Sequence, residues 1–445
     1  MSGPAKTTYL SHDGAQLNTD SLFSYFFGRS LLACALCTAL LFSVSGCDKE
    51  LDPDTPEPAA GSQNDDDTEP ATPNTASAVN PVAEGSVRFA SYNVSFYRDQ
   101  IGGLIEELQT GDSDVVCKIT EVIQMTRPDV LLLNEFDYDE EGEAAALYQK
   151  NYLAVSQAGN EPIEYEYSYF APVNTGIDSG LDLDGNGETG TPNDAFGFGK
   201  HPGQYGMLIL SRHEIETDNV RTFQNFLWKD MPDAMWPETT DGESYYSDEI
   251  KEIFRLSSKS HWDVPVNIGE DNVVHFLVSH PTPPVFDGPE DRNGCRNHDE
   301  IRLFADYVSG RADYLYDDKG GGGGLAGDAR FVIAGDLNAD PNDGDSRENA
   351  ARLLTENSAV NSTAPVSTGG QHYAEVAGGG NASHSGDPAE DTSAWRNGHM
   401  RVDYCMPSAS LSVTASGVFW PLPDEAGADA VTATDHRMVW VDIEK

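Results

Sequence analysis

Several short apolar runs in this chain lead directly into a polar residue that can bind a metal ion or move a proton. Side chains at the ends of neighbouring strands meet at one rim of a sheet, where a rigid scaffold can hold them together. A single Asn or Asp after a strand is more often a turn residue, so the evidence is the whole set. The set comprises Asn93, Glu135, His280, Asp336, Asn338, Asp403, Asp435 and His436.

The spacing of apolar residues predicts a mixture of strands and helices. Strands are expected at residues 87–94, 129–134, 205–211, 273–279, 330–334, 400–406 and 438–443. Helices are expected at residues 101–126, 299–308 and 347–355. Pro128 ends the first helical run. This mixture predicts an α/β layered sandwich.

Strong acidity limits the partners of the chain. The 74 Asp and Glu residues against 27 Lys and Arg give a formal net charge of −47. Residues 47–86 contain only ten acidic residues and one lysine, so most of this charge lies on the rest of the chain. Such a surface repels a long polyanion unless metal ions or a local basic patch intervene. The composition therefore disfavours an indiscriminate nucleic-acid binder, while 38% hydrophobic residues are enough for a folded core.

The N-terminal region predicts export. Residues 30–46 form an apolar run that is too short to span a bilayer comfortably. The run ends in VSGC at Cys47, which resembles the lipobox of bacterial lipoproteins. We therefore expect residues 1–46 to be a signal peptide and Cys47 to carry lipid; an ordinary signal peptide that ends near Cys47 is the alternative. The acidic, proline-rich residues 47–86 are expected to form a disordered tether. These features predict a lipid anchor on the bacterial cell envelope, facing the periplasm or the outside, as the only membrane contact.

Three cysteines remain after the lipid-bearing one. Cys117, Cys295 and Cys405 lack the paired spacing of a zinc site. They allow at most one disulfide. Buried thiols and a single bridge both remain open.

Segments along the whole region after the tether resemble one known family. SYNV, RPDVLLLNEFD, QYGMLILSRHEI, FLVSHPTPP, IAGDLNADP, RVDYCMPS and ATDHRMVWVDI occur in that family's order from Ser91 to Ile443. They resemble the endonuclease/exonuclease/phosphatase superfamily, the deoxyribonuclease I-like phosphoesterases. GDLNADP and the terminal TDH are specific to it, whereas SYNV is not. The resemblance implies one catalytic domain at residues 87–445, built as two packed mixed β-sheets flanked by helices (a four-layer α/β sandwich). It also implies hydrolysis of a phosphoester by water with a divalent metal ion.

The resemblance assigns a metal ion to Glu135, with contributions from Asn93 and Asp435. Carboxylate and amide oxygens without cysteine ligands independently suit Mg²⁺, Mn²⁺ or Ca²⁺. Such an ion neutralises a phosphoryl oxygen and stabilises the charge that grows in the transition state.

The resemblance also assigns catalytic roles. Asp336 matches the carboxylate that activates or orients the attacking water, and Asn338 matches the amide that holds the water or the phosphate. His436 matches a phosphate-contacting histidine. Asp403 would fix the tautomer of His436 and favour its cationic form. An ion pair between Asp403 and Arg401 is the alternative interpretation.

His280 bears on the substrate class. It matches a histidine that deoxyribonuclease-like, sphingomyelinase-like and phosphatase-like members use as a general acid or phosphate ligand, whereas abasic-site nucleases differ there. In deoxyribonuclease I-like members a Glu that supports this histidine precedes a Gln-Tyr pair resembling Gln204-Tyr205. Here that position is Gly203. How His280 is polarised therefore stays open.

A glycine-rich acidic segment resembles the opening of a calcium loop. SGLDLDGNGETG places Asp182, Asp184 and Asn186 at alternating positions, with Gly187 next. Position twelve of such a loop is Asn193 in place of the usual Glu. A structural Ca²⁺ site and a plain acidic turn both remain open.

Two segments carry rare positive or proton-bearing side chains. In FRLSSKSHWDVPV, Arg255, Lys259 and His261 are expected either to line a phosphate pocket or to pair with surface acids. The long polar segment after His280 is expected to form a rim of the active site. Its candidate substrate contacts are Arg292, Arg296, His298 and Arg302.

The leading interpretation is a divalent-metal-dependent hydrolase of small phosphomonoesters or phosphodiesters on the cell envelope. An extracellular nuclease is the main alternative, so nucleic acid remains a candidate substrate, and a phospholipid phosphodiesterase is the third. An inactive surface binding module would be marked by loss of metal ligands or histidines, and these are all present. Nothing in the sequence implies a protein partner.

Overall fold

The computed structural model describes residues 81–270, 272–396 and 398–445. The predicted signal peptide, Cys47 and the tether up to residue 80 lie outside the described residues. Among the helices that the structure describes, none has the length and apolar character needed to cross a bilayer.

Two six-stranded sheets form the centre of the described region. The first has the order β13-β14-β1-β2-β4-β3, and only its β1–β2 pair is parallel. Its strands are β1 (Ser86–Phe96), β2 (Val130–Phe136), β3 (Tyr167–Tyr169), β4 (Met207–Ser211), β13 (Val413–Val418) and β14 (Val439–Glu444).

The second sheet has the order β12-β9-β8-β7-β5, with β6 pairing with β7, and only its β8–β9 pair is parallel. Its strands are β5 (Glu214–Ile215), β6 (Arg221–Thr222), β7 (His261–Asn267), β8 (Val273–Ser279), β9 (Phe331–Asp336) and β12 (Asp403–Pro407). A separate hairpin joins β10 (Ser393–Trp395) to β11 (Gly398–Met400).

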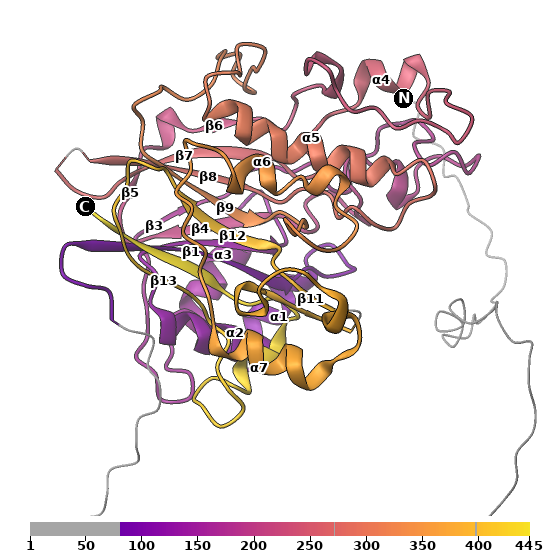
Figure 1. The fold of residues 1–445 in the computed structure, drawn as a ribbon. Coiled ribbons are helices and arrows are strands. Elements are labelled where there is room, and N and C mark those ends of the chain that lie inside the picture. Colours follow the sequence, from indigo (N-terminus) through magenta and orange to yellow (C-terminus); the bar gives the residue numbers. More distant parts are fainter. Residues whose placement is uncertain (1–80, 271, 397) are drawn as a thin grey trace, which may run out of the picture. The chain divides into compact units, whose positions relative to one another are not determined.

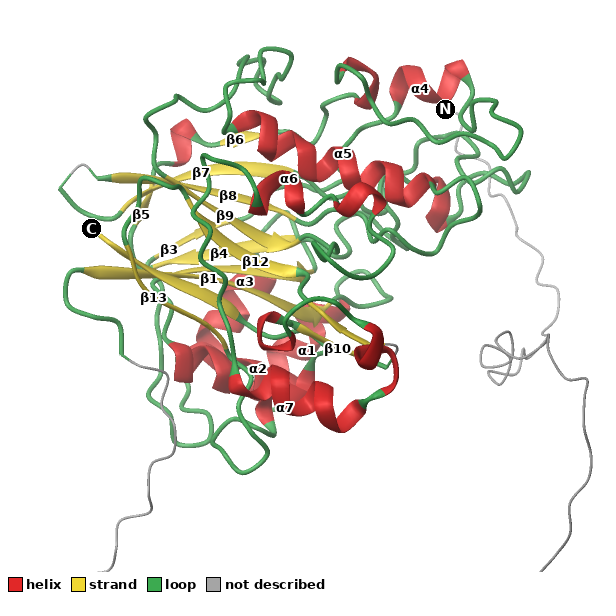
Figure 2. Ribbon diagram, viewed as in Figure 1, coloured by secondary structure: helices red, strands yellow, loops and turns green. Residues whose placement is uncertain are grey.

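Helices cover the outer faces of both sheets, as Figures 1 and 2 show. Helices α1, α2 and α7 lie beside the first sheet, and α5 and α6 lie beside the second. The predicted four-layer α/β sandwich is therefore confirmed. The helices are α1 (Gly103–Thr110), α2 (Asp114–Thr126), α3 (Glu143–Tyr148), α4 (Asp248–Ile253), α5 (Arg292–Tyr307), α6 (Arg352–Thr355) and α7 (Thr368–Ala377).

The core explains why the apolar runs form these layers. One buried cluster fills the space between the two sheets and beneath α1 and α2, and it includes Phe89 and Phe276 from opposite sheets, whose ring centroids are 5.4 Å apart. A second cluster packs α5 against the outer face of β8 and β9. Each sheet is thus buried on both faces, which accounts for continuous apolar runs such as the VLLL of β2.

Several predicted elements differ from the observed ones. The helical run at 101–126 is two helices, because Gly111 adopts a left-handed conformation with φ of 72° and ends α1. The predicted helix at 299–308 begins earlier, at Arg292, so half of the predicted rim after His280 is helical. The predicted helix at 347–355 shortens to α6.

Candidate active site

The site forms where strands of both sheets end at the same edge. Asp336 is the last residue of β9, and Asp403, the first residue of β12, is its direct partner in the ladder. His280 follows β8, which runs parallel to β9. Asn93 comes from β1 in the other sheet, which contacts β9. The two sheets therefore bring together residues that are more than 300 positions apart in the sequence.

Asp336 is the centre of this group. Its Oδ2 accepts a hydrogen bond from Asn93 Nδ2 at 3.0 Å, and lies 3.5 Å from His280 Nε2 and 3.7 Å from His436 Nε2. Its Oδ1 accepts from the main-chain N–H of Asn338 at 2.8 Å. Asp336 is 1% exposed, so its carboxylate has little contact with bulk water and interacts mainly with protein groups.

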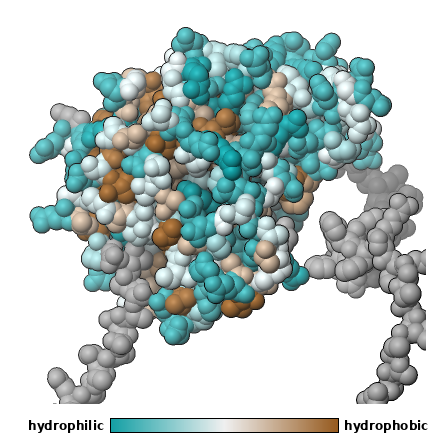
Figure 3. All heavy atoms as spheres, viewed as in Figure 1, coloured by the Kyte–Doolittle hydropathy of each residue, from teal (hydrophilic) through white to brown (hydrophobic). Residues whose placement is uncertain are grey.

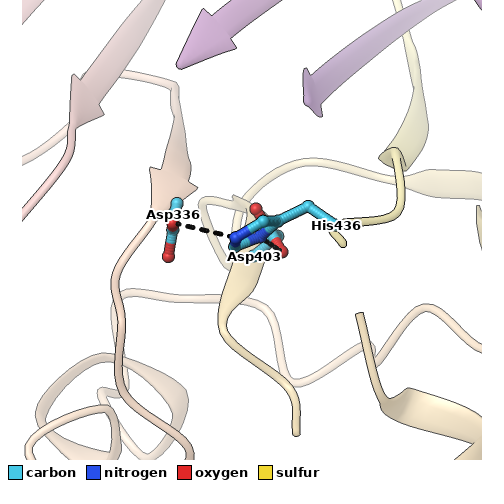
Figure 4. A group of neighbouring side chains, drawn as sticks. All are labelled: Asp336, Asp403 and His436. Carbon is cyan, nitrogen blue, oxygen red and sulfur yellow. Dashed lines mark hydrogen bonds and ion pairs between the residues drawn. The ribbon is translucent and has the colours of Figure 1, made fainter. Parts of the chain in front are cut away.

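Asp403 and His436 form a buried pair beside Asp336 (Figure 4). His436 Nδ1 lies 2.8 Å from Asp403 Oδ2. Burial opposes a charge on the imidazole, but the carboxylates of Asp403, Asp336 and Asp435 outweigh it and raise the pKa of His436 well above its ordinary value. The alternative partner of Asp403 is engaged elsewhere, because Arg401 Nη1 donates to Glu390 Oε2 at 2.7 Å. His436 is therefore a cation whose Nε2–H faces Asp336.

Glu135 is presented to the cavity by an irregularity between two strands. The β1–β2 register shifts between Asn93 and Phe96, so two residues of β1 lie opposite Glu135. Glu135 itself has a φ of 60°, unusual for a non-glycine residue. Burial raises the pKa of its carboxyl to about 7, with Asp336 adding to the effect and His436, Asn93 and Lys259 opposing it.

His280 lacks the carboxylate partner that the family resemblance leads one to expect. Its Nδ1 is buried with no hydrogen-bond partner among the described residues. Gly203 has a φ of +87°, and a Cβ there would lie 2.7 Å from the carbonyl oxygen of Tyr138, so no side chain fits. Burial, reinforced by Lys259 and His436, holds the pKa of His280 well below its ordinary value. His280 is therefore a neutral imidazole.

Lys259 is a positively charged residue of the cavity whose side chain is free to contact a substrate. Its side chain lines the same cavity as Glu135, His280 and Asp336, and the residue is 7% exposed. In the described part of the chain no hydrogen bond or ion pair engages its Nζ. Burial lowers its pKa, while Glu300, Glu135 and Asp336 oppose that change.

The other predicted positive groups are already occupied. Arg255 Nη1 donates to Asn174 Oδ1 at 2.6 Å, and Arg292 lines the cavity but pairs with Glu290. His261 is buried between Ser257 Oγ and the carbonyl oxygen of Glu300, and burial lowers its pKa to about 4. These residues hold the walls in place.

The donor set fits a hard divalent ion. Carboxylate oxygens of Glu135, Asp336 and Asp435 line the same cavity. Asp336, Asp403 and His436 also place ligand atoms within 4.8 Å of one another, but the protonated His436 has no lone pair to give to a metal. The Asn93 amide is turned differently from the prediction, because its nitrogen donates to Asp336 and its oxygen accepts from Ser95 N. Oxygen-rich ligands with water completing the shell are typical of Mg²⁺. The roles of individual ligands stay predictions.

The predicted calcium loop has a different third member. Carboxylate oxygens of Asp182, Asp184 and Asp194 lie within 4.8 Å of one another. Asn186 accepts from Glu188 N, and Asn193 Nδ2 donates to Asp184 Oδ2 at 2.9 Å. Calcium binding by this loop stays a prediction.

Sequence reasoning missed supporting residues around the site. Asn134 Oδ1 accepts from the main-chain N–H of Asp336 at 3.3 Å, and Trp395 Nε1 donates to Asp435 Oδ2 at 3.0 Å. Thr392 Oγ1 accepts from Asp403 N at 2.9 Å. Only Asn134 gave a signal, as a polar residue inside an otherwise apolar run.

The remaining three cysteines are free. Cys295 and Cys405 are buried, and Cys117 is partly buried. The structure therefore favours the thiol interpretation over a disulfide.

Comparison with known families assigns the chain. The model of the endonuclease/exonuclease/phosphatase family matches residues 90–436, which include all eight site residues predicted from strand ends. The chain belongs to this family. A search of curated proteins finds no match.

Solved structures with a similar fold come from several bacteria. An endonuclease/exonuclease/phosphatase from Beutenbergia cavernae is 18% identical over 81% of this chain and 71% of that one, with a TM-score of 0.45. A family protein from Leptotrichia buccalis is 14% identical over 81% and 100%, with a TM-score of 0.42. Sphingomyelinase C from Streptomyces griseocarneus is 14% identical over 80% and 99%, with a TM-score of 0.40.

Proposed function

We propose that this protein hydrolyses phosphoester bonds with the help of a divalent metal ion, acting on small phosphomonoesters or phosphodiesters at the bacterial cell envelope. The observation that carries the proposal is the convergence of Asn93, His280 and His436 on one oxygen of Asp336, beside the unpaired cation of Lys259. Family membership supports the same class of reaction.

The charge and position of each side chain indicate its role in the reaction. Asp336 is the acceptor that can orient water and take its proton as the water oxygen attacks phosphorus. His436, held as a cation by Asp403, and Lys259 can donate to phosphoryl oxygens as their negative charge grows. His280 can donate from Nε2 as a neutral group. The bond from phosphorus to the alcohol oxygen then breaks; the departing oxygen takes up a proton from solvent, and Asp336 later returns to solvent the proton that it took from the attacking water.

A divalent ion held near Glu135 and Asp435 would neutralise a phosphoryl oxygen and lower the barrier electrostatically. Mg²⁺ is the first choice, with Mn²⁺ and Ca²⁺ as alternatives, because the available ligands are carboxylate oxygens. The lipid anchor at Cys47 remains part of the proposal and lies outside the described residues.

Lys259 offers a direct test. The purified protein is assayed with Mg²⁺, Mn²⁺ and Ca²⁺ against p-nitrophenyl phosphate, bis(p-nitrophenyl) phosphate, DNA and sphingomyelin. Lys259→Met should lower kcat/KM on the preferred substrate by roughly 10- to 100-fold, because one cation facing the transition state is lost. Lys150→Met, at an exposed lysine on the surface, is the matched control and should leave the rate unchanged.

The substrate panel also tests the nuclease alternative. A preference for DNA over both p-nitrophenyl esters would show that the substrate class is nucleic acid and not small phosphoesters. Absence of hydrolysis on every substrate with every metal would refute the proposal.

A further inference from the structure

The cavity over the catalytic residues is larger than a phosphate group requires. Its volume is about 1180 Å³, above the usual range of roughly 300–1,000 Å³ for small-molecule pockets. The catalytic side chains form only one part of its wall. The remaining space must take the organic part of a substrate, so the chemistry of the other walls indicates what that part is.

One wall, which we call the apolar arm, is lined by Leu183, Ala195, Tyr246, Phe254 and Val285. Four of these five side chains are at least nine-tenths buried. Tyr246 and Phe254 meet edge to face with ring centroids 5.1 Å apart, which fixes their orientation. Leu183, Tyr246 and Phe254 belong to the second hydrophobic cluster, so the arm brings part of that cluster to the cavity.

The two arginines beside the apolar arm already have partners, and the carboxylate of Asp184 also lines the cavity there. Arg292 pairs with Glu290, and the Arg296 guanidinium donates to the main-chain carbonyls of Leu256, Phe196 and Arg255 while lying 4.7 Å from the Phe254 ring centroid. Among the described residues beside the arm, no arginine is left without a partner to hold a second phosphate. The arm thus suits an uncharged group.

The mouth of the cavity is marked by exposed aromatic rings. Phe286 is 87% exposed, Phe198 52% and Tyr97 36%, and all three line this cavity. They are the only aromatic side chains among the large hydrophobic residues that are exposed in the described region. The face drawn in Figure 3 is mostly hydrophilic, with hydrophobic residues in small separate groups. A cluster of this kind at a cavity mouth indicates contact with an apolar ligand.

A different stretch of the wall is acidic. Asp340, Asp343 and Asp345 come from the loop after β9 and line the cavity near Asp336. Their charges disfavour a polyanion that would have to extend past the reacting phosphate. A nucleic-acid chain therefore fits this cavity poorly.

We propose that the substrate is a phosphoester whose organic part is a bulky apolar group, aryl or alkyl, seated in the apolar arm while its phosphate meets Lys259, His280 and His436. This inference rests on the proposed function and narrows its substrate class. The apolar group can belong to a soluble ester or to a lipid, and the chemistry of the arm is the same for both.

Binding of phosphonates tests the inference without hydrolysis, because their carbon–phosphorus bond is not a phosphoester. The full chain carrying Cys47→Ser, which removes the lipid-bearing thiol, is titrated with methylphosphonate, benzylphosphonate and octylphosphonate by calorimetry with Mg²⁺ present. Each methylene that leaves water should raise affinity about fourfold. Octylphosphonate, kept below its micelle concentration, should therefore bind at least about 30-fold more tightly than methylphosphonate.

Variants locate the effect. Val285→Asp places a charge in the apolar arm and should reduce octylphosphonate affinity to near that of methylphosphonate, while it lowers methylphosphonate affinity far less, because only the octyl chain reaches the arm. Phe286→Ser alters an exposed residue at the cavity mouth and serves as the second variant if Val285→Asp does not fold. It should weaken octylphosphonate binding several-fold. Val366→Asp, at an exposed valine that does not line the cavity, is the control and should change neither affinity.

Each outcome decides a separate question. Equal affinities of the wild type for methylphosphonate and octylphosphonate would overturn the inference. So would a loss of octylphosphonate affinity in Val366→Asp as large as the loss in Val285→Asp. Hydrolysis of bis(p-nitrophenyl) phosphate without any preference for octylphosphonate would leave the proposed function intact and refute only the apolar arm. Tight octylphosphonate binding without hydrolysis of any ester would refute the proposed function alone. If the inference holds, binding to phosphatidylcholine vesicles identifies a lipid source, and binding to benzylphosphonate without vesicle binding identifies a soluble one.

Discussion

Four non-glycine residues near the reacting groups have a left-handed backbone conformation. Ser95, Glu135, Tyr205 and Asn338 have φ values between 52° and 60°. Only Asn338 is a residue type that adopts this conformation readily. Such conformations persist where surrounding structure holds them, and they are concentrated at functional sites. Here β1 and β4 on either side of β2 hold Glu135 facing the cavity, and hydrogen bonds to Asp336 Oδ1 and the Pro281 carbonyl oxygen hold Asn338.

Asp403 and His436 should act as one unit. Asp403→Asn, His436→Ala and the double variant should each lower kcat/KM by about 10²-fold or more, because a mispositioned or neutral imidazole cannot stabilise charge on the phosphoryl group. Steady-state kinetics on all three variants tests this. Losses that add together in the double variant would show that the two residues act independently.

Asp391 should destabilise the protein increasingly as pH rises. Burial, with Asp340, Asp343, Asp387 and Glu390, raises its pKa from an ordinary 3.8 to about 8. The folded state therefore holds a proton that the unfolded chain has released, and stability falls as pH rises from about 4 to about 8. Asp391→Asn removes this effect. Its gain in Tm over the wild type should grow between pH 5 and pH 9, reaching roughly 2 °C or more.

The control for this pH dependence is Asp424→Asn, at an exposed aspartate. Thermal unfolding of both variants at pH 5, 7 and 9 gives the comparison. A gain that is equal at all three pH values, or one that Asp424→Asn reproduces, would contradict the account.

At the level of elements, the close approach of β8 and β9 brings His280 and Asp336 together. Gly335 makes this approach possible. Its φ is +145°, and a Cβ there would lie 1.9 Å from the carbonyl oxygen of Ser279. A side chain at this position must push the two strands apart or distort the end of β9.

Gly335→Ala should therefore lower both stability and activity. The free energy of unfolding should fall by more than about 2 kcal/mol, because backbone atoms must move and a positive φ is strained in alanine. Gly327→Ala is the matched control, since nothing lies within 4 Å of a Cβ there. Denaturant unfolding of both variants measures the difference; equal losses would mean that the β8–β9 contact tolerates a side chain.

Elements with continuous apolar patterns were predictable from the sequence, and those stabilised by buried polar contacts were not. The strand predicted at 273–279 is β8 itself. Its neighbour β7 was missed because it contains Pro265 and the buried Asp263, which accepts hydrogen bonds from His275 and Tyr307. The start of α5 was missed for the same reason, since its first two turns bury Arg296, Asn297 and His298.

In the candidate site, too, some features could be predicted from the sequence and others depend on contacts that only the fold creates. Its candidate catalytic residues follow strands, so their positions could be predicted, together with the departure at Gly203. The sequence could not show that Lys259, among the candidate positive groups, is the one left to contact a substrate. That result follows from the partners that the fold gives to Arg255, Arg292 and His261. The apolar arm arises from three segments that only the fold brings together.

At the level of the whole molecule, the sequence predicts that a lipid anchor holds the protein at a membrane. Cys47→Ser should release the protein from membranes into the soluble fraction, because one acylated cysteine is the only anchor that the sequence predicts. Fractionation of cells that express each form measures this. Retention of Cys47→Ser in the membrane fraction would instead indicate that residues 30–46 remain as an uncleaved apolar segment.

We propose metal-dependent phosphoester hydrolysis at the cavity that Glu135 and Asp336 line. The most direct measurement is the rate of bis(p-nitrophenyl) phosphate hydrolysis by the wild type and by Glu135→Gln across a Mg²⁺ titration, with thermal unfolding as the check on folding. Wild-type activity should require added metal and disappear with EDTA. Glu135→Gln should fold normally and lose at least about 10²-fold in kcat/KM even at saturating Mg²⁺, because a charged ligand is replaced by a neutral one of the same size. Wild-type rates in a folded Glu135→Gln protein, or activity that EDTA leaves unchanged, would contradict the claim.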